Sequence, residues 1–489
     1  MAFSPRSSLA LAAALSVLAG TAHAQEGAVA VTTLAPPDLF SMPTAETGLP
    51  DDLWKDASPS LMRQVLPTLG AKPLSPAFAA FARRVLATGA HAPKGIGDDP
   101  EMGAARGLGL IALGEAAGAK QVLDRTPGLD QNSALAMAGA EANLIRGDDE
   151  RACAIANALG VDRGGGYWLR LRAFCQQRAG QLDEAQLTFN LAQQQSQDPA
   201  YVRMMTALLA KTPDTGSGDL RNGIDFALST TLALDIRSPA AAATASPALR
   251  PVTAPAPGDL AAAQASDWTF LRAAKPGTDF AVAARAAAPL IASTVAAGGP
   301  MDQMLFLRAA LAAGDVKTAQ AIRGGLTGAA PQDLALIDAA LAADSGEPTD
   351  AALHTLVEQG AAAGAKSPLQ PAAVVLQGLG GALSPEDRAT FAGFEAGKST
   401  ASSARLALLD SAALAGRKGE AALLALWIAG EAGAAGPAPA DRARIISALN
   451  RAGLAVDARA IAAEGLLPAP PAPAKPAAAK PAAKPVKKK

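Results

Sequence analysis

The sequence contains few of the residue types that support catalysis or metal binding. Among 489 residues there are three histidines, two cysteines and 4% aromatic side chains. Only His91 and His354 lie beyond the first 24 residues, and no neighbouring residue pattern marks either one as a base or a metal ligand. We therefore predict no catalytic residue, no cofactor and no metal, which favours a protein that is not an enzyme.

A nucleotide site is also not expected, although residues 392–399 fit a loose phosphate-loop pattern. The segment reads AGFEAGKS, with alanine at the position where the stricter motif has glycine. No strand rich in β-branched residues precedes it. We predict a loop between two helices at this position.

Long apolar runs are absent except at the N-terminus. Arg6 is followed by an apolar run from Leu9 to Gly20 and by the small-residue sequence Ala-His-Ala at 22–24. This pattern is typical of a secretory signal peptide, residues 1–24, cleaved before Gln25. We expect a periplasmic or secreted protein with no membrane span after cleavage, since the alanine-rich segment 280–299 is interrupted by an arginine and a proline.

The two cysteines, Cys153 and Cys175, are candidates for a disulfide bond. Their midpoint, residue 164, lies in the triple glycine at 164–166, so two antiparallel helices joined there would bring the thiols to the same height. An exported protein meets an oxidising environment. A bridge of this loop length contributes roughly 3 kcal/mol in the chain-entropy description. The alternative is a pair of small core residues on facing helices.

A glycine followed five residues later by an alanine recurs along the chain. The spacings between successive glycines include 33, 33, 32 and 37 residues. A repeat near 34 residues with glycine at a turn and alanine after it indicates a helical hairpin, because glycine accepts the positive φ that ends a helix and alanine allows close packing. The predicted repeat-turn glycines are Gly114, Gly147, Gly180, Gly314, Gly346, Gly416 and Gly453.

The unit from Trp168 to Pro199 shows the pattern most clearly. It places large and small residues on one face of each of two helices, at Trp168, Leu171, Gly180, Ala185, Phe189, Ala192 and Pro199. At these positions the chain resembles the tetratricopeptide repeat family, with departures of about one residue in register. The resemblance implies an all-α fold, a superhelical array of antiparallel helix hairpins, or α-solenoid.

Proline and glycine mark the boundaries of the array. Residues 25–50 lack periodicity and form an irregular leader, and Ser75-Pro76 and Ser384-Pro385 are typical helix starts. Five prolines within 238–258 predict a linker between an N-terminal helical array, 51–237, and a C-terminal array, 259–467. The alternative is that this segment folds along the surface of the array.

The last segment, residues 468–489, alternates proline, alanine and lysine. This composition predicts a disordered, extended tail. Its basic residues, Lys475, Lys480, Lys484, Lys487, Lys488 and Lys489, contrast with a net charge of −1 for the whole chain. The tail is either a solvated appendage or a contact for an anionic cell-wall polymer or other envelope component. The export signal and the lack of interleaved aromatics argue against nucleic acid.

Two hypotheses for the function follow. The first is an envelope scaffold or adaptor that binds a protein or peptide partner through its helical-repeat surface, since stacked hairpins present extended concave surfaces. The second is a lytic enzyme acting on the peptidoglycan cell wall, or its helical accessory, because soluble lytic transglycosylases are also exported and alanine-rich. The chain ends in a tail where such enzymes have a catalytic domain, so we favour the adaptor.

Overall fold

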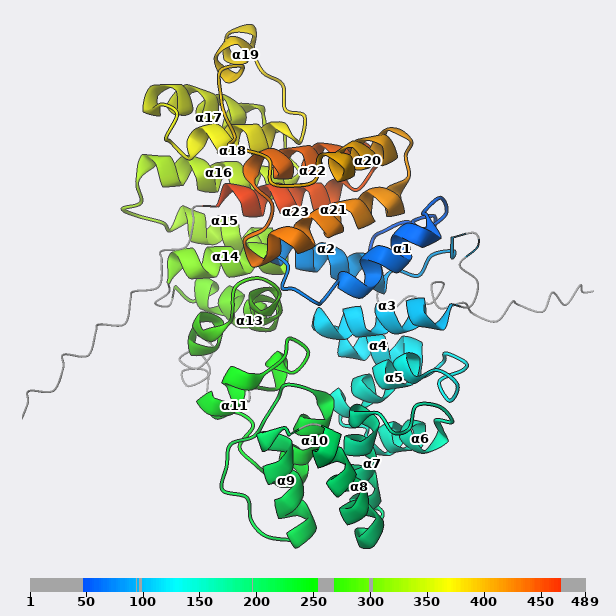
Figure 1. Ribbon diagram of the computed structural model, residues 1–489. Helices are drawn as coiled ribbons and strands as arrows, with labels where there is room; N and C mark the ends of the chain where they lie inside the picture. The colour runs from blue at the N-terminus through cyan, green and yellow to red at the C-terminus, as the bar shows by residue number, and fades with distance from the viewer. Residues whose placement is uncertain are drawn as a thin grey trace, which may run out of the picture. The chain divides into compact units, whose positions relative to one another are not determined.

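Helices make up all the regular structure that the computed structural model describes (Figure 1), in residues 47–93, 95, 99–195, 197–253, 268–298 and 302–467. No β-strand occurs in these ranges, which confirms the all-α prediction. The predicted signal peptide, most of the predicted leader and the basic tail with its six lysines lie outside the described residues.

The described residues from 47 to 231 form ten α-helices and one short 3-10 helix. Their bounds are α1 (Pro59–Val65), η1 (Leu66–Thr68), α2 (Pro76–Ala87), α3 (Pro100–Ala112), α4 (Ala116–Leu123), α5 (Ser133–Ile145), α6 (Asp149–Ala158), α7 (Gly166–Arg178), α8 (Leu182–Gln195), α9 (Pro199–Ala210) and α10 (Gly223–Thr231).

The described residues after α10 form α11 (Pro239–Thr244), η2 (Arg250–Thr253), α13 (Thr278–Ala296), α14 (Gln303–Ala313), α15 (Val316–Gly324), α16 (Pro331–Ser345), α17 (Asp350–Ala363), α18 (Leu369–Gln377), α19 (Pro385–Phe391), α20 (Ser403–Leu414), α21 (Lys418–Ala432), η3 (Gly433–Ala435), α22 (Pro439–Arg451) and α23 (Ala455–Leu466).

Helix starts follow the local sequence. Several helices carry proline in the first turn, where its missing N–H costs no hydrogen bond, and α2 and α19 begin at Pro76 and Pro385 as predicted. At α19 the Ser384 hydroxyl accepts the Asp387 N–H, an ordinary N-cap. The Ser75 hydroxyl makes no such bond at α2, so that helix requires a different cap.

The predicted repeat-turn glycines lie where the pattern placed them. Each of the seven stands between two successive helices that contact each other, and each has a positive φ, between 67° and 84°. Six of the alanines five residues later are completely buried: Ala119, Ala152, Ala185, Ala319, Ala421 and Ala458. Ala351 is exposed instead, because α17 turns Leu353, Leu356 and Val357 inward. The glycine marks the turn in every case, while the alanine marks the contact face in all but one.

Helix α2 lies among helices from distant parts of the chain. It packs against α3, α13, α14, α21 and α23. Eight of its twelve residues are buried, so it presents apolar surface on most sides, including Phe78 and Phe81. One continuous hydrophobic core runs from Leu53 in the N-terminal segment to Leu466 in α23. The first helices of the chain therefore belong to the same core as its last helices.

Two glycines allow this close packing. A Cβ at Gly419, at the start of α21, would lie 2.3 Å from the Leu53 carbonyl oxygen. A Cβ at Gly277, just before α13, would lie 2.5 Å from the Leu74 carbonyl oxygen, and Gly277 also has a φ of 93°. Both backbones approach the N-terminal segment too closely for any side chain, and Gly277 adopts a conformation that favours glycine.

The N-terminus of α2 is capped by a carboxylate from the other end of the chain. Glu464 in α23 accepts hydrogen bonds from the Ala77 backbone N–H and from the Ser75 hydroxyl. Arg442 in α22 donates to the same carboxylate at 3.0 Å, and its guanidinium lies over the Phe78 ring. The carboxylate thus accepts a backbone N–H that has no partner within α2, and its negative charge interacts favourably with the positive end of the α2 dipole.

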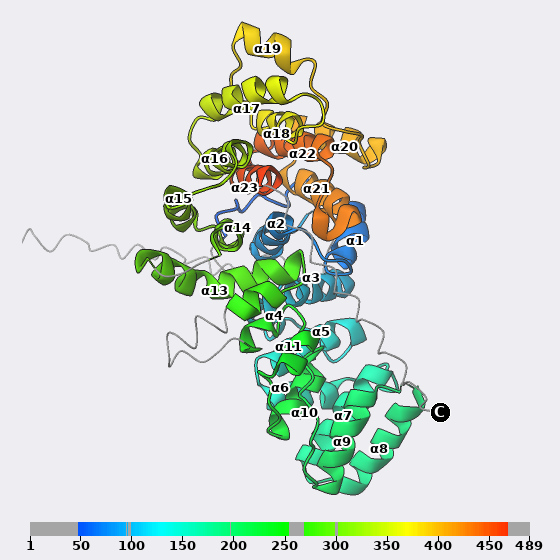
Figure 2. The same cartoon turned by 90° about the vertical axis from the view of Figure 1, so that its left-hand side faces the viewer.

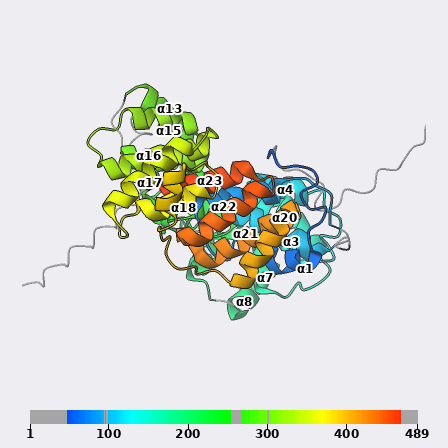
Figure 3. The ribbon, with the colours of Figure 1, turned by 90° about the horizontal axis from the view of Figure 1, so that it is seen from above.

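A second ion pair joins the same two helices. Arg84 in α2 pairs with Asp457 in α23, whose side chain is only 4% exposed. Burial raises the pKa of Asp457 to about 6, against the opposing effect of Arg84. Figure 3 shows α23 beside α22 and α18. The helix that caps α2 therefore packs on other helices of the C-terminal half.

Residues 238–253, the first part of the segment predicted as a linker, are folded as α11 and η2. Arg250 is 2% exposed and binds Asp279 of α13 through two hydrogen bonds of 2.8 Å. It also donates to the Ala242 carbonyl oxygen. The prolines prevent a long helix here, but the buried bidentate pair fixes the segment against α13. Residues 254–258 of the predicted linker lie outside the described residues.

Helix α13 is the one described helix with the length and apolarity of a membrane span. Its mean hydropathy is 1.3, and 44% of its eighteen-residue window is buried inside the structure. It contains Pro289 and packs against α2, α14, α15 and η2.

The Glu464 cap gives a direct test of this packing. We predict that Glu464→Gln lowers the free energy of unfolding by about 2 kcal/mol, because a buried N–H loses a charged acceptor. The control is Asp338→Asn, which breaks the exposed Arg323 pair and should cost less than about 1 kcal/mol. Urea unfolding measures both, and equal effects would contradict the proposed importance of the cap.

Candidate functional site

The predicted disulfide is present between Cys153 in α6 and Cys175 in α7. The two Cα atoms are 5.5 Å apart, and the helices run antiparallel as the glycine-centred turn predicted. Arg178 at the end of α7 also pairs with Asp149 at the start of α6, at 3.3 Å. The bond fixes one hairpin and leaves no free thiol in the chain.

The residues that carry the repeat resemblance lie mainly in the packed interior. Trp168, Leu171, Ala185, Phe189 and Ala192 are each 4% exposed or less. The Trp168 ring N–H donates to the Ser133 hydroxyl in α5 at 2.9 Å, so α7 is tied to the preceding hairpin as well as to α8. These side chains have a structural role in the packing of the hairpin.

A polar cluster holds α10 against the start of α9. Arg221 pairs with three carboxylates, those of Asp198, Asp219 and Asp225, at 2.8, 2.9 and 3.4 Å. Burial and the two neighbouring carboxylates raise the pKa of Asp225 to about 7. Its buried Oδ1 has no hydrogen-bond partner. Burial is the main cause of this shift, and the single cation Arg221 only partly offsets it, so the contacts within the fold account for the cluster.

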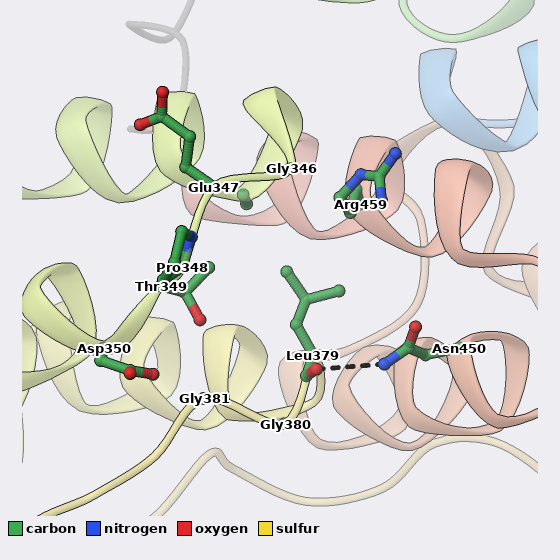
Figure 4. Close-up of a pocket in the computed structure, with 11 residues that line it drawn as sticks. Gly346, Glu347, Pro348, Thr349, Asp350, Leu379, Gly380, Gly381, Asn450 and Arg459 are labelled. Atoms are coloured by element: carbon green, nitrogen blue, oxygen red, sulfur yellow. Dashed lines mark hydrogen bonds between the residues drawn. The ribbon is translucent and has the colours of Figure 1, made fainter.

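A small open pocket of about 250 Å³ lies where two loops meet the last two helices (Figure 4). The turn between α16 and α17 supplies Gly346 and Thr349, and the segment after α18 supplies Leu379. Asn450 of α22 donates to the Leu379 carbonyl oxygen at 3.1 Å. The remaining lining residues are Ala343, Glu347, Pro348, Asp350, Gly380, Gly381 and Arg459.

Charge in this pocket is divided between its two sides. Arg459 projects beside Gly346, while Asp350 lies on the other side and accepts the Ala382 N–H at 2.7 Å. Behind the lining, Asp344 has a pKa raised by burial, with Arg459 opposing the shift. The Glu347 side chain points out of the pocket (Figure 4). The pocket is therefore polar and of mixed charge.

The segment that resembles a phosphate loop anchors a helix. Residues 392–399 follow α19 as a loop, and no strand precedes them. Asp441, in the first turn of α22, accepts hydrogen bonds from the Ser399 hydroxyl and from the Thr400 and Ala401 N–H groups. The loop donates its hydrogen bonds to a carboxylate of the protein itself, so its role is to connect two helices.

One face of α20 is exposed and carries no charge. It consists of Ser403, Ala404, Ala407, Leu408, Ser411, Leu414 and Ala415, where Leu408 is 56% and Leu414 is 72% exposed. Both charged side chains of the helix are bound to neighbouring helices instead. Arg405 pairs with Glu431 of α21 and lies over Trp427, and Asp410 pairs with Arg444 of α22. Figure 2 shows α20 at the edge of this helix group. We call these seven residues the α20 face.

Helix α8 has a narrower exposed apolar stripe. Leu187 is 64% and Leu191 is 43% exposed, one helical turn apart. Asp183 and Glu184 lie near its N-terminus, and the rest of its exposed surface is uncharged. Helix α8 packs mainly on α7 and α9 among the described helices. With Leu182, which is 39% exposed, it forms a second surface with exposed leucines.

Comparison with known proteins does not indicate what these surfaces bind. No protein family, curated protein or solved structure matches the chain. Among the described residues no group of three or more histidine, cysteine, aspartate or glutamate side chains could hold a metal ion.

Sequence patterns did not indicate the pocket or the α20 face. The pocket combines residues 343–350 with residues 379–381, 450 and 459, and only the fold brings them together. On α20, alanines and leucines surround the helix, so periodicity does not separate the buried side from the exposed one. The signal that could have been read is the placement of Arg405 and Asp410, since both lie off the uncharged face.

Removing the disulfide should destabilise the protein without changing its fold. We predict that Cys153→Ser with Cys175→Ser lowers the free energy of unfolding by roughly 3 kcal/mol, because the unfolded chain regains loop freedom. Urea unfolding of the native protein and the double variant measures this change. Non-reducing mass spectrometry should find two hydrogens fewer than in the dithiol, and two free thiols would refute the bond.

The raised pKa of Asp225 predicts a pH dependence of stability. Its folded-state pKa of about 7 exceeds the usual 3.8, so the folded protein holds this proton more tightly than the unfolded chain does. The stability that Asp225 contributes is present below about pH 4 and is lost as the pH rises to about 7. Asp225→Asn should remove this loss. The free energy of unfolding of the variant, relative to that of the native protein, should therefore increase between pH 4.5 and 7. A pH-independent difference in urea unfolding would contradict this.

Proposed function

We propose that this protein is an exported scaffold that binds a protein partner through the exposed surface of a tetratricopeptide-like α-solenoid. The hairpins and their glycine turns support this architecture. Repeat arrays of this type present extended surfaces for binding other proteins. The observation that carries the proposal is the α20 face.

The composition of the α20 face suits a protein contact. Its small residues allow a partner backbone to approach closely, and Leu408 and Leu414 provide apolar anchors. A helix surface of this length usually carries charges on its solvent side. Here Arg405 and Asp410 pair with α21 and α22, so a partner would desolvate no charge on this face. Exposed apolar surface of this kind marks interaction sites.

Export is part of the proposal. The predicted signal peptide and the Cys153–Cys175 bond both fit an oxidising compartment such as the periplasm or the extracellular space. In this account the basic tail from Lys475 to Lys489 contacts an anionic envelope component and tethers the scaffold. The contact would weaken as salt increases, since it is electrostatic.

Photo-crosslinking in cells tests the binding surface. A photoreactive residue in place of Ser411, at the centre of the α20 face, should give a discrete adduct with an envelope protein. Leu408→Glu with Leu414→Glu should abolish the adduct, because the charges would have to be buried at the interface. Both sites are exposed, so the stability of the scaffold should change by less than about 1 kcal/mol.

The matched control is Val456→Glu on α23. Val456 is 55% exposed, comparable with Leu408, but belongs to a different helix. This variant should retain the adduct. Absence of an adduct from position 411, or an adduct that persists in the Leu408 and Leu414 double variant, would reject the α20 face as the binding surface.

A cell-wall lytic activity is the alternative, and the pocket at Arg459 is the observation that favours it. Glycoside hydrolysis uses one carboxyl kept protonated by its surroundings and one carboxylate. Asp350 lines the pocket, and Asp344, whose pKa is raised by burial, follows the lining residue Ala343 in the chain. Asp344 itself is not among the lining residues, and Asp350 already accepts the Ala382 N–H. Release of fragments from purified sacculi that is lost in Asp350→Asn would favour the enzyme over the scaffold.

A further inference from the structure

Two arginines meet at the junction of α2, α13 and the turn between α3 and α4. Arg83 comes from α2 and Arg285 from α13, and Glu115 follows the repeat-turn glycine Gly114. The Arg83 Nη1 lies 3.6 Å from the Glu115 Oε2. The Arg285 Nη2 donates to the Leu113 carbonyl oxygen at 3.4 Å. Both guanidiniums therefore share one small region of the structure.

These guanidiniums have fewer acceptors than donors. Each carries five N–H groups, yet among the described residues their polar contacts are the two long ones, to Glu115 and to the Leu113 carbonyl oxygen. The Nε of Arg83 is buried and has no hydrogen-bond partner. The neighbouring Arg84 offers no acceptor, since a guanidinium only donates, and its own donors are bound to Asp457 and to the Thr47 carbonyl oxygen.

The positive charge is also incompletely balanced. Arg83 and Arg285 bring two positive charges, and Glu115 brings one negative charge. Burial, followed by repulsion from Arg83, lowers the pKa of Arg285 to about 10, while Glu115 opposes this change. Burial likewise lowers the pKa of Arg83. A partly desolvated excess of one positive charge attracts an anion more strongly than an exposed pair does.

The junction remains open to solvent on one side. The side chain of Arg83 is 22% exposed and that of Glu115 is 25% exposed. Gly114 lies against Val282 and Arg285, since a Cβ there would lie 2.5 Å from Val282 and 3.4 Å from the Arg285 Nη2. Because Arg83 and Glu115 are partly exposed, a small solute can approach the Arg83 guanidinium from solvent.

We propose that Arg83 and Arg285 form a binding site for a tetrahedral oxyanion, a phosphate group. A carboxylate has two oxygens and suits a single guanidinium, whereas a phosphate has enough oxygens to accept from two guanidiniums on different helices. The site is separate from the α20 face and does not depend on its function. Free phosphate and a phosphate group carried by an envelope molecule would use the same donors.

Calorimetric titration of the purified mature protein with sodium phosphate tests the site, with sodium chloride at matched ionic strength as the blank. The native protein should bind one phosphate per chain. Arg285→Gln should weaken the affinity about tenfold or more, as loss of charge-assisted hydrogen bonds requires. Arg285→Lys, which keeps the charge but not the fork of donors, should weaken it by less.

The matched control is Arg323→Gln, which removes the same charge from an exposed arginine that Asp338 already pairs. It should leave phosphate binding unchanged, and circular dichroism should show native helix content in every variant. No phosphate binding by the native protein, an unchanged affinity in Arg285→Gln, or an equal loss in Arg323→Gln would each overturn the proposal. Titration with a soluble phosphomonoester then distinguishes a carried phosphate group, which would bind with similar affinity, from free phosphate alone.

Discussion

The carboxylate of Glu464 at the N-terminus of α2 is the contact on which the arrangement of the helices depends. It joins residues almost 400 positions apart and places α2 between α23, α21, α13 and α3. Alanine-rich helices bury little surface per residue, so their packing depends on close backbone approach and on a few polar contacts that fix position. Gly277 and Gly419 provide the close approach, and Glu464 with Asp457 provides the polar contacts.

This arrangement explains which parts of the fold the sequence could predict. Turn glycines are local features, because a positive φ is a property of one residue, and all seven lie at turns between contacting helices. The disulfide depended only on the symmetry of two helices about residue 164. The cap on α2, by contrast, required knowing that α23 returns to α2. No local pattern shows that Ser75 would bind Glu464 rather than its own helix.

The proline-rich segment illustrates the same limit. Five prolines exclude a long helix in residues 238–258 but do not exclude short helices held by a buried ion pair, and Arg250 with Asp279 is such a pair. The α20 face could not be predicted from the sequence either, because alanines and leucines occur on every side of this helix. Only the structure shows that Arg405 and Asp410 pair with α21 and α22. The helical body with its uncharged α20 face, together with the predicted signal peptide and the lysines of the C-terminal segment, is the basis for the scaffold proposal.

The central claim is that α2 and α23, which come from opposite ends of the described chain, belong to one cooperative body. Hydrogen exchange of the mature protein, followed by mass spectrometry of peptides from residues 76–87 and 455–466, tests it directly. If α2 and α23 open together, their slowest amides exchange at the same rate and respond equally to low concentrations of urea. Exchange in α2 that is much faster than in α23, with a different response to urea, would contradict the account.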